Sequence, residues 1–267
     1  MQLISMAKYI TIFILLKICL AQTASISDVT ITKKECACGK IKGNSVYKYK
    51  WMVALMKQNQ KVCTGFLISP EYVLTAAHCI NGTETIGLPT RKRMKIVGIS
   101  EMFTHPNDTS GNKSYDIAII KLQKKLSCTQ YTPICLPNIC GMDSDNTSTV
   151  IATWRSRNST KNSLNNSRLN LVDTNLVINH KTCPVEEPKY SNKFCASGDT
   201  KDVICPGDSG SPLFLKKRKI WYAVGVLSYV VINTVSSCSQ HGYFVRIVTS
   251  LDWVSKVTKI PVQSLKC

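Results

Sequence analysis

The chain has 267 residues, 44% of them hydrophobic, which is enough for one sizeable domain or two small ones with a genuine core. Charged residues make up 19% of the chain, so the composition excludes a disordered protein, and the sequence has no repeat of solenoid period. The formal net charge is +18, concentrated in clusters such as Arg91-Lys92-Arg93 and Lys216-Lys217-Arg218-Lys219. We interpret this charge as solvated loop charge, with attraction to an anionic glycan or an acidic partner surface as the alternative.

The first residues have the pattern of a secretory signal peptide. A run from Tyr9 to Leu20 is apolar apart from Thr11 and Lys17, and Cys19-Leu20-Ala21 places small residues where a signal peptidase cuts. The run is shorter than the ~20 apolar residues of a membrane-spanning helix. We therefore expect a signal peptide over residues 1–21 and a secreted protein with no stable membrane anchor. Export also disfavours a nucleic-acid partner.

Cysteine usage and glycosylation sequons agree with export. Thirteen cysteines include Cys19 in the expected signal, and the remaining twelve form an even, dense set that is typical of disulfides. No Cys-x-x-Cys pair or close His/Cys cluster supports a zinc site. Six Asn-x-Ser/Thr sequons indicate glycosylated surface loops, and they begin at Asn81, Asn107, Asn112, Asn146, Asn158 and Asn165.

From Trp51 onward, short apolar or alternating segments are separated by turns that contain Gly, Asn and Pro. Their length and β-branching predict antiparallel strands over Trp51–Met56, Gly65–Ser69, Tyr72–Ala76, Ile117–Leu122, Leu169–Ile178, Ile220–Val231 and Tyr243–Val248. Asp143–Asn170, which is rich in Asn, Ser and Thr, is expected to be exposed loop around one short strand containing Trp154. One helix is predicted, roughly Val248–Val257, where apolar residues recur at three-residue spacing. The expected class is all-β with a closing helix.

Three segments contain the groups that activate a serine nucleophile. A serine hydroxyl needs an imidazole to take its proton, and the imidazole needs a carboxylate that fixes its tautomer. Leu74-Thr75-Ala76-Ala77-His78-Cys79 supplies an imidazole, and Tyr115-Asp116-Ile117 supplies a carboxylate before an apolar strand. Cys205-Pro206-Gly207-Asp208-Ser209-Gly210-Ser211-Pro212 supplies a serine among glycines. In that turn the amides of Gly207 and Ser209 can point together at a developing oxyanion.

In the order His, Asp, Ser, these segments resemble the three signatures of the trypsin/chymotrypsin family of serine proteases. The resemblance implies that His78 is the general base and acid, Asp116 its orienting partner and Ser209 the nucleophile. It implies that the amides of Gly207 and Ser209 form the oxyanion hole. It also implies a fold of two six-stranded antiparallel β-barrels with a C-terminal helix. We expect a monomeric serine endopeptidase acting on protein or peptide substrates.

The segment Lys40-Ile41-Lys42-Gly43-Asn44 resembles the activation site of this family, although its second lysine and its asparagine replace the usual Val and Gly. A cut after Lys40 by an activating trypsin-like protease would free the amino group of Ile41 to pair with Asp208. The expected organisation is thus a propeptide over 22–40 and a protease domain over 41–267. The alternative is a basic loop that is never cut.

The resemblance also places the primary specificity pocket. Val203, six residues before the nucleophile, would lie at the base of the pocket, and Ser228 under the triad aspartate. Val230 replaces a glycine that is usual on the pocket wall, whereas Gly242 matches an open wall position. We expect a neutral pocket for small or medium apolar side chains. The alternative is trypsin-like specificity through a bulge that brings Asp202 into the pocket.

The resemblance implies three disulfides, Cys63–Cys79, Cys183–Cys195 and Cys205–Cys238, and a fourth between Cys135 and either Cys36 or Cys38. The pairing of the other propeptide cysteine, Cys128, Cys140 and Cys267 stays open. No metal and no cofactor is expected, because no acidic cluster follows His78 to match the family's calcium loop.

A second hypothesis is a catalytically weak relative that binds or regulates other proteins. Thr153-Trp154-Arg155 stands where the family has Gly-Trp-Gly, which keeps this hypothesis open. A protease inhibitor and an anionic glycan are further candidate partners under either hypothesis.

Overall fold

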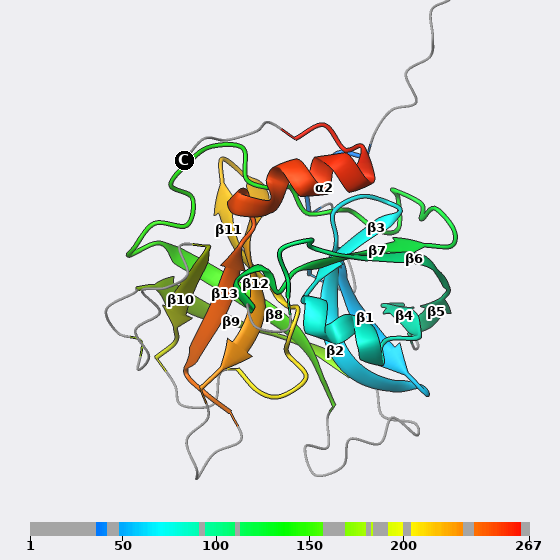
Figure 1. The fold of residues 1–267 in the computed structure, drawn as a ribbon, viewed down its shortest axis with the longest axis horizontal. Coiled ribbons are helices and arrows are strands. Elements are labelled where there is room, and N and C mark those ends of the chain that lie inside the picture. Colours follow the sequence, from blue (N-terminus) through cyan, green and yellow to red (C-terminus); the bar gives the residue numbers. More distant parts are fainter. Residues whose placement is uncertain are drawn as a thin grey trace, which may run out of the picture. The chain divides into compact units, whose positions relative to one another are not determined.

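The computed structural model describes residues 36–41, 48–90, 94–109, 113–156, 169–179, 183, 192–199, 204–231 and 238–262. The chain divides into two units, residues 1–35 and 36–267, and every described residue belongs to the second. The expected signal peptide and most of the expected propeptide therefore lie outside the described residues. The second unit consists mainly of β-strands, which form two sheets (Figure 1).

The first sheet has seven antiparallel strands in the order β5-β4-β1-β2-β3-β7-β6. They are β1 (Met52–Lys57), β2 (Gln60–Leu67), β3 (Tyr72–Thr75), β4 (Thr85–Leu88), β5 (Lys95–Val97), β6 (Ile99–Thr104) and β7 (Ala118–Leu122). The two edge strands, β5 and β6, are separated along the chain by Gly98 alone, so the sheet must curl until its edges come together there.

The second sheet is a closed six-stranded barrel in the order β10-β13-β12-β11-β8-β9. Its strands are β8 (Ser148–Ser156), β9 (Leu169–Ile178), β10 (Lys193–Ser197), β11 (Pro212–Lys217), β12 (Ile220–Val230) and β13 (His241–Arg246). A short 3-10 helix, Val248–Ser250, leads into the helix α2 (Leu251–Thr258). The expected closing helix is therefore present, although its α-helical part begins three residues later than predicted.

The prediction of two six-stranded barrels is confirmed for the second sheet, whereas the first sheet has seven strands and is not a closed barrel. Gly98 lies between β5 and β6, and its carbonyl accepts a hydrogen bond of 3.0 Å from the backbone amide of Gln123. This bond lies beside the pairing of Ile99 with Leu122, after which the register between β6 and β7 shifts. Neither β5 nor β6 was among the predicted strands.

An aromatic cluster joins the two sheets. Tyr49 and Trp51, just before β1, pack edge-on against Phe214 of β11, with ring centroids 4.8 and 5.8 Å from that of Phe214. All three side chains are fully buried. Because edge-to-face pairs of this kind are favourable beyond their burial, the cluster fixes how the two sheets face each other.

The region Asp143–Asn170 differs from its predicted form. β8 has nine residues, and Ile151, Ala152, Thr153 and Trp154 are all buried. Polar residues on either side of this strand dominate the composition and conceal it. Residues 157–168 lie outside the described residues.

The structure describes five disulfides: Cys36–Cys128, Cys38–Cys135, Cys63–Cys79, Cys183–Cys195 and Cys205–Cys238. The three implied by the family resemblance are among them, and the partner of Cys135 is Cys38. Cys140 is also disulfide-bonded, and Cys267 lies outside the described residues. Two disulfides thus tie the segment before Lys40 to Cys128 and Cys135, farther along the chain.

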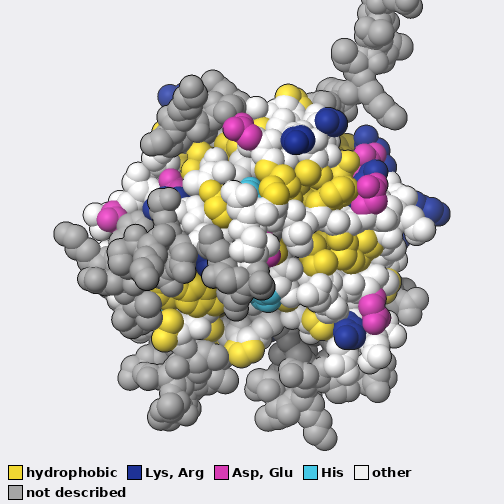
Figure 2. Space-filling view, in the orientation of Figure 1, with side chains coloured by type: hydrophobic (Ala, Val, Ile, Leu, Met, Phe, Trp, Pro, Cys, Tyr) yellow, Lys and Arg dark blue, Asp and Glu magenta, His cyan; other side chains and the backbone are white. Residues whose placement is uncertain are grey.

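Three of the six sequon asparagines are described, and all three lie on the surface. Asn81, Asn107 and Asn146 are exposed, and the other three sequon asparagines lie outside the described residues. On the face shown in Figure 2, described acidic and basic side chains are interspersed and form no continuous basic field. No helix among the described residues is long and apolar enough to cross a membrane.

Candidate active site

His78 and Asp116 meet at one end of a strand pair. The 3-10 helix η1 (Ala77–Gly82) follows β3 and contains His78, while Asp116 comes just before β7. β3 and β7 are antiparallel neighbours, so the end of one lies beside the start of the other. The backbone amide of His78 donates to Oδ1 of Asp116 at 2.9 Å, and His78 Nδ1 lies 2.8 Å from Oδ2.

The carboxylate of Asp116 is buried and multiply hydrogen-bonded. The hydroxyl of Ser228 donates to Oδ2 at 2.6 Å, and Lys193 Nζ donates to the Ser228 oxygen at 3.3 Å. Burial alone would raise the pKa of Asp116, but hydrogen bonds from His78 and Ser228 hold this pKa below its ordinary value. The carboxylate therefore stays ionised and can keep a proton on Nδ1 of His78.

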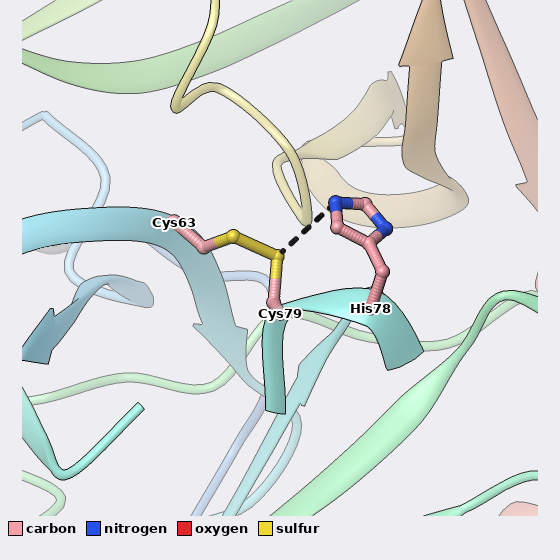
Figure 3. A group of neighbouring side chains, drawn as sticks. All are labelled: Cys63, His78 and Cys79. Carbon is pink, nitrogen blue, oxygen red and sulfur yellow. Dashed lines mark hydrogen bonds between the residues drawn. A yellow bond between two sulfur atoms is a disulfide. The ribbon is translucent and has the colours of Figure 1, made fainter. Parts of the chain in front are cut away.

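The second ring nitrogen of His78, Nε2, faces the Cys63–Cys79 disulfide, 3.6 Å from the sulfur of Cys79 (Figure 3). Within the described part of the chain, His78 and Ser209 form no hydrogen bond. In the tautomer with a proton on Nδ1, Nε2 carries a lone pair, and a disulfide sulfur has no proton to offer it. The contact is therefore weak and leaves Nε2 available to a hydroxyl.

The Ser209 turn packs directly on the segment that carries His78. Gly207 and Gly210 have φ of +86° and +79°, a left-handed conformation that glycine adopts without strain. The amide of Thr64 donates to the Ser209 carbonyl at 2.9 Å. A Cβ at Gly210 would lie 3.1 Å from the amide nitrogen of Ala76, two residues before His78. This packing brings the serine and the imidazole segments together.

The amides expected to form the oxyanion hole are those of Gly207 and Ser209. Neither donates a hydrogen bond to another described residue. Both residues are partly exposed. Two such amides in one turn can bind an oxygen that gains negative charge.

Asp208, beside Ser209, points into the interior and is only 1% exposed. Its Oδ1 accepts a hydrogen bond of 2.7 Å from the hydroxyl of Thr153, and its Oδ2 accepts one of 2.8 Å from Arg155. The ammonium of Lys61 lies 3.7 Å from Oδ1. The amide of Cys205 donates to Oδ2 at 2.9 Å.

The expected activation bond lies on the surface of the uncut chain. Lys40 is exposed and Ile41 is 38% exposed. Just before them, the Gly39 carbonyl accepts a hydrogen bond of 2.9 Å from the amide of Trp221, and Cys38 is bonded to Cys135. The chain is thus fixed on one side of the bond that is expected to be cut.

Apart from Ser228, the described residues of the expected pocket are apolar or glycine. Val230 of β12 pairs directly with Gly242 of β13. A Cβ at Gly242 would lie 2.6 Å from Cδ1 of Ile204, so this buried isoleucine fills the space that the glycine leaves open. Val203 and Asp202 lie outside the described residues.

Two groups of cysteine and histidine lie close enough to suggest metal ligands: Cys63, His78 and Cys79, and Cys183, Cys195 and His241. In both groups the cysteines are joined as disulfides, so no thiolate is present. Each group therefore offers one imidazole, which does not fit a structural zinc site.

Sequence reasoning did not identify Lys61, Lys193 or Ile204 as site residues. A lysine in a short alternating segment normally faces solvent, and nothing in the sequence marks these two as buried. Ile204 comes directly after Val203, the expected base of the pocket. Its position beside Gly242 is visible only in the structure.

A family model described as Trypsin matches residues 40–254. The chain therefore belongs to the trypsin family of serine proteases. Vitamin K-dependent protein C of Mus musculus is 30% identical, over 76% of this chain and 48% of that protein. Granzyme E of Mus musculus is 32% identical, over 76% of this chain and 82% of that protein. The chain thus matches about half the length of protein C and most of the length of granzyme E.

Proposed function

We propose that this protein is a serine endopeptidase that hydrolyses peptide bonds through an acyl-enzyme. The observation that carries the proposal is the 2.8 Å contact between His78 Nδ1 and a buried Asp116, beside a turn that presents Ser209. Membership of the trypsin family supports the same chemistry and implies protein substrates.

In this mechanism Ser209 Oγ attacks the carbonyl carbon while His78 Nε2 takes the hydroxyl proton. Asp116 stabilises the resulting imidazolium, and the amides of Gly207 and Ser209 bind the oxyanion. His78 then gives the proton to the leaving amine, which departs as the C–N bond breaks. A water molecule, deprotonated by His78, attacks the acyl-enzyme and releases the acid and free Ser209. The imidazole must turn from the Cys79 sulfur toward Ser209 for this sequence.

The proposed primary specificity is for small or medium apolar side chains. The side chain of Ile204 occupies the space beside Gly242, and this side chain would make the proposed pocket narrower. Val230 adds a branched side chain opposite Gly242. An aliphatic lining without a described carboxylate favours an apolar residue over a lysine or arginine. Val203 at the pocket base remains part of the proposal, and Asp202 is the basis of the trypsin-like alternative.

We further propose that the protein is secreted as a glycosylated zymogen and is activated by a cut after Lys40. The signal peptide would span residues 1–21, the propeptide 22–40 and the protease domain 41–267. The exposure of Lys40 and Ile41 supports access by a trypsin-like activating protease. The five described disulfides support an oxidising compartment.

The test is a peptide-library cleavage profile of the protein cut after Lys40, beside a Ser209→Ala control. Cleavage after small or medium apolar residues by the wild type alone supports the whole proposal. Cleavage after Lys or Arg supports the protease but overturns the apolar pocket in favour of Asp202. No cleavage by a folded, correctly cut sample favours a binding or regulatory relative. The orientation of His78 Nε2 toward a disulfide is the observation that keeps this second candidate in view.

A further inference from the structure

Asp208 has a complete set of partners before any cut is made. Its two oxygens accept hydrogen bonds from Thr153, Arg155 and the amide of Cys205, at 2.7, 2.8 and 2.9 Å. Ile41, whose amino group is proposed to pair with this carboxylate after activation, is 38% exposed in the uncut chain. The buried charge is thus already compensated by side chains of the protease domain itself.

The partners of Asp208 come from both sheets. Thr153 and Arg155 are two residues apart on β8, so both side chains lie on the same face of that strand. Lys61 lies on β2 of the first sheet, with Nζ 3.7 Å from Asp208 Oδ1 and 3.5 Å from the Thr153 hydroxyl. A Cβ at Gly207 would lie 3.7 Å from the same Nζ. The cations therefore surround the turn that carries the oxyanion amides.

We propose that Arg155, assisted by Lys61, is a positioning residue that holds Asp208 inside the protein and thereby keeps the oxyanion turn formed in the uncut chain. The inference rests on the proposed protease function. It adds that the chain has peptidase activity of its own before cleavage after Lys40. After the cut, the freed amino group of Ile41 competes with the Arg155 guanidinium for the Asp208 carboxylate, which already has a partner.

The physical reason is the high free energy of an unpaired buried carboxylate. Removing one partner of a buried ion pair is strongly destabilising, because the remaining charge has no compensation. Asp208 at 1% exposure would have to leave the interior if its cations were lost, and Gly207 and Ser209 would move with it. Arginine suits this role because its planar group stays charged and donates in fixed directions to a carboxylate.

The inference predicts different sensitivities of the uncut and cut forms. In the uncut chain, only internal cations compensate Asp208, so Arg155→Met should release the turn. In the cut chain, the amino group of Ile41 can take the place of Arg155. The same substitution should therefore reduce activity much less after the cut.

The experiment uses the full chain with Lys40→Gln, which blocks the proposed cut, beside wild type cut by a lysine-specific endoprotease and verified by its Ile41 terminus. Labelling of Ser209 by a fluorophosphonate probe and hydrolysis of an apolar peptide substrate are measured for each. We expect Lys40→Gln to be labelled, and Arg155→Met to slow that labelling about tenfold or more, with a smaller loss in the cut form.

Two variants separate positioning from folding. Arg155→Lys keeps a cation near Asp208 and should restore part of the labelling. Arg218→Met makes the same substitution at an exposed arginine between β11 and β12 and should leave the labelling unchanged.

Each negative outcome has a separate meaning. If the cut wild type is active and Lys40→Gln is inert, the inference is wrong and the proposed function stands. If neither form reacts, the proposed function itself fails. An equal loss in both forms on Arg155→Met would show that Arg155 only stabilises the fold, which also overturns the inference.

Discussion

The hydroxyl of Ser228 donates a 2.6 Å hydrogen bond to Oδ2 of Asp116, and this bond joins the closed barrel to the first sheet. Ser228 lies in β12, whereas Asp116 precedes β7. The same carboxylate oxygen lies 2.8 Å from His78 Nδ1. The orientation of the imidazole therefore depends on how the two sheets are docked.

Ser228→Ala should lower the rate of peptide hydrolysis about tenfold, because a hydrogen bond to a charged group is lost. The pKa of Asp116 would rise, since one of the donors that lower it is gone. Steady-state kinetics of the cut protein measure the loss. Ser100→Ala, which removes an exposed hydroxyl from β6, is the matched control. An unchanged rate would show that Ser228 does not act on the carboxylate.

Asp116→Asn should lower kcat by about four orders of magnitude, because the amide no longer fixes the productive tautomer of the imidazole. The fold should survive, since asparagine has nearly the same shape. Steady-state kinetics of the cut protein measure the effect, and near-ultraviolet circular dichroism checks the packing. Activity within about tenfold of wild type would rule out Asp116 as the orienting carboxylate.

Gly210→Ala should destabilise the protein by about 3 kcal/mol or more, because the new methyl group would overlap Thr64 and Thr75 at a φ of +79°. Gly82→Ala is the matched control, since a Cβ there meets nothing within 4 Å. Thermal unfolding of the two variants should differ clearly. Similar melting temperatures would mean that the Ser209 turn does not pack on β2 and β3 as described.

Burial lowers the pKa of Lys61 from 10.5 to about 8, and nearby Arg155 adds to this while Asp208 opposes it. Between these two pH values the folded protein binds fewer protons than the unfolded chain. Stability should therefore rise as the pH increases from about 8 to 10.5. Lys61→Met should remove this part of the slope, as measured by the free energy of unfolding at several pH values. Lys216→Met, at an exposed site, should show the same dependence of the free energy of unfolding on pH as wild type. If Lys61→Met also keeps that dependence, Lys61 is not the source of the slope.

After a cut at Lys40, the segment containing Cys36 and Cys38 should stay attached through Cys128 and Cys135. Mass spectrometry of the cut protein without reductant should give the mass of the uncut chain plus one water. Reduction should release the short segment. Its release without reductant would show that at least one of these two disulfides does not form.

The distinctive segments around His78, Asp116 and Ser209 were sufficient to propose a catalytic site, and the structure brings His78 and Asp116 into contact. The strand periods predict much of both sheets. Sequence reasoning failed where burial depends on distant partners. β8 was underestimated because polar residues surround it, and the sequence alone does not show that Arg155 and Lys61 converge on Asp208.

The edge strands of the first sheet show a second kind of failure. The sequence did not predict β5 or β6, and the carbonyl of Gly98 between them accepts a hydrogen bond from the backbone amide of Gln123. Which carbonyl accepts which amide is decided by the register of three strands together. No local pattern contains that information.

The groups proposed for catalysis are divided between the two sheets, with His78 and Asp116 on the first and Ser209 and Ser228 by the second. A chain in which only one sheet has formed would hold a base without a nucleophile, or a nucleophile without a base. Peptide hydrolysis would then require both sheets to have formed and docked. On this proposal, a chain that is still folding would not digest its unfolded neighbours.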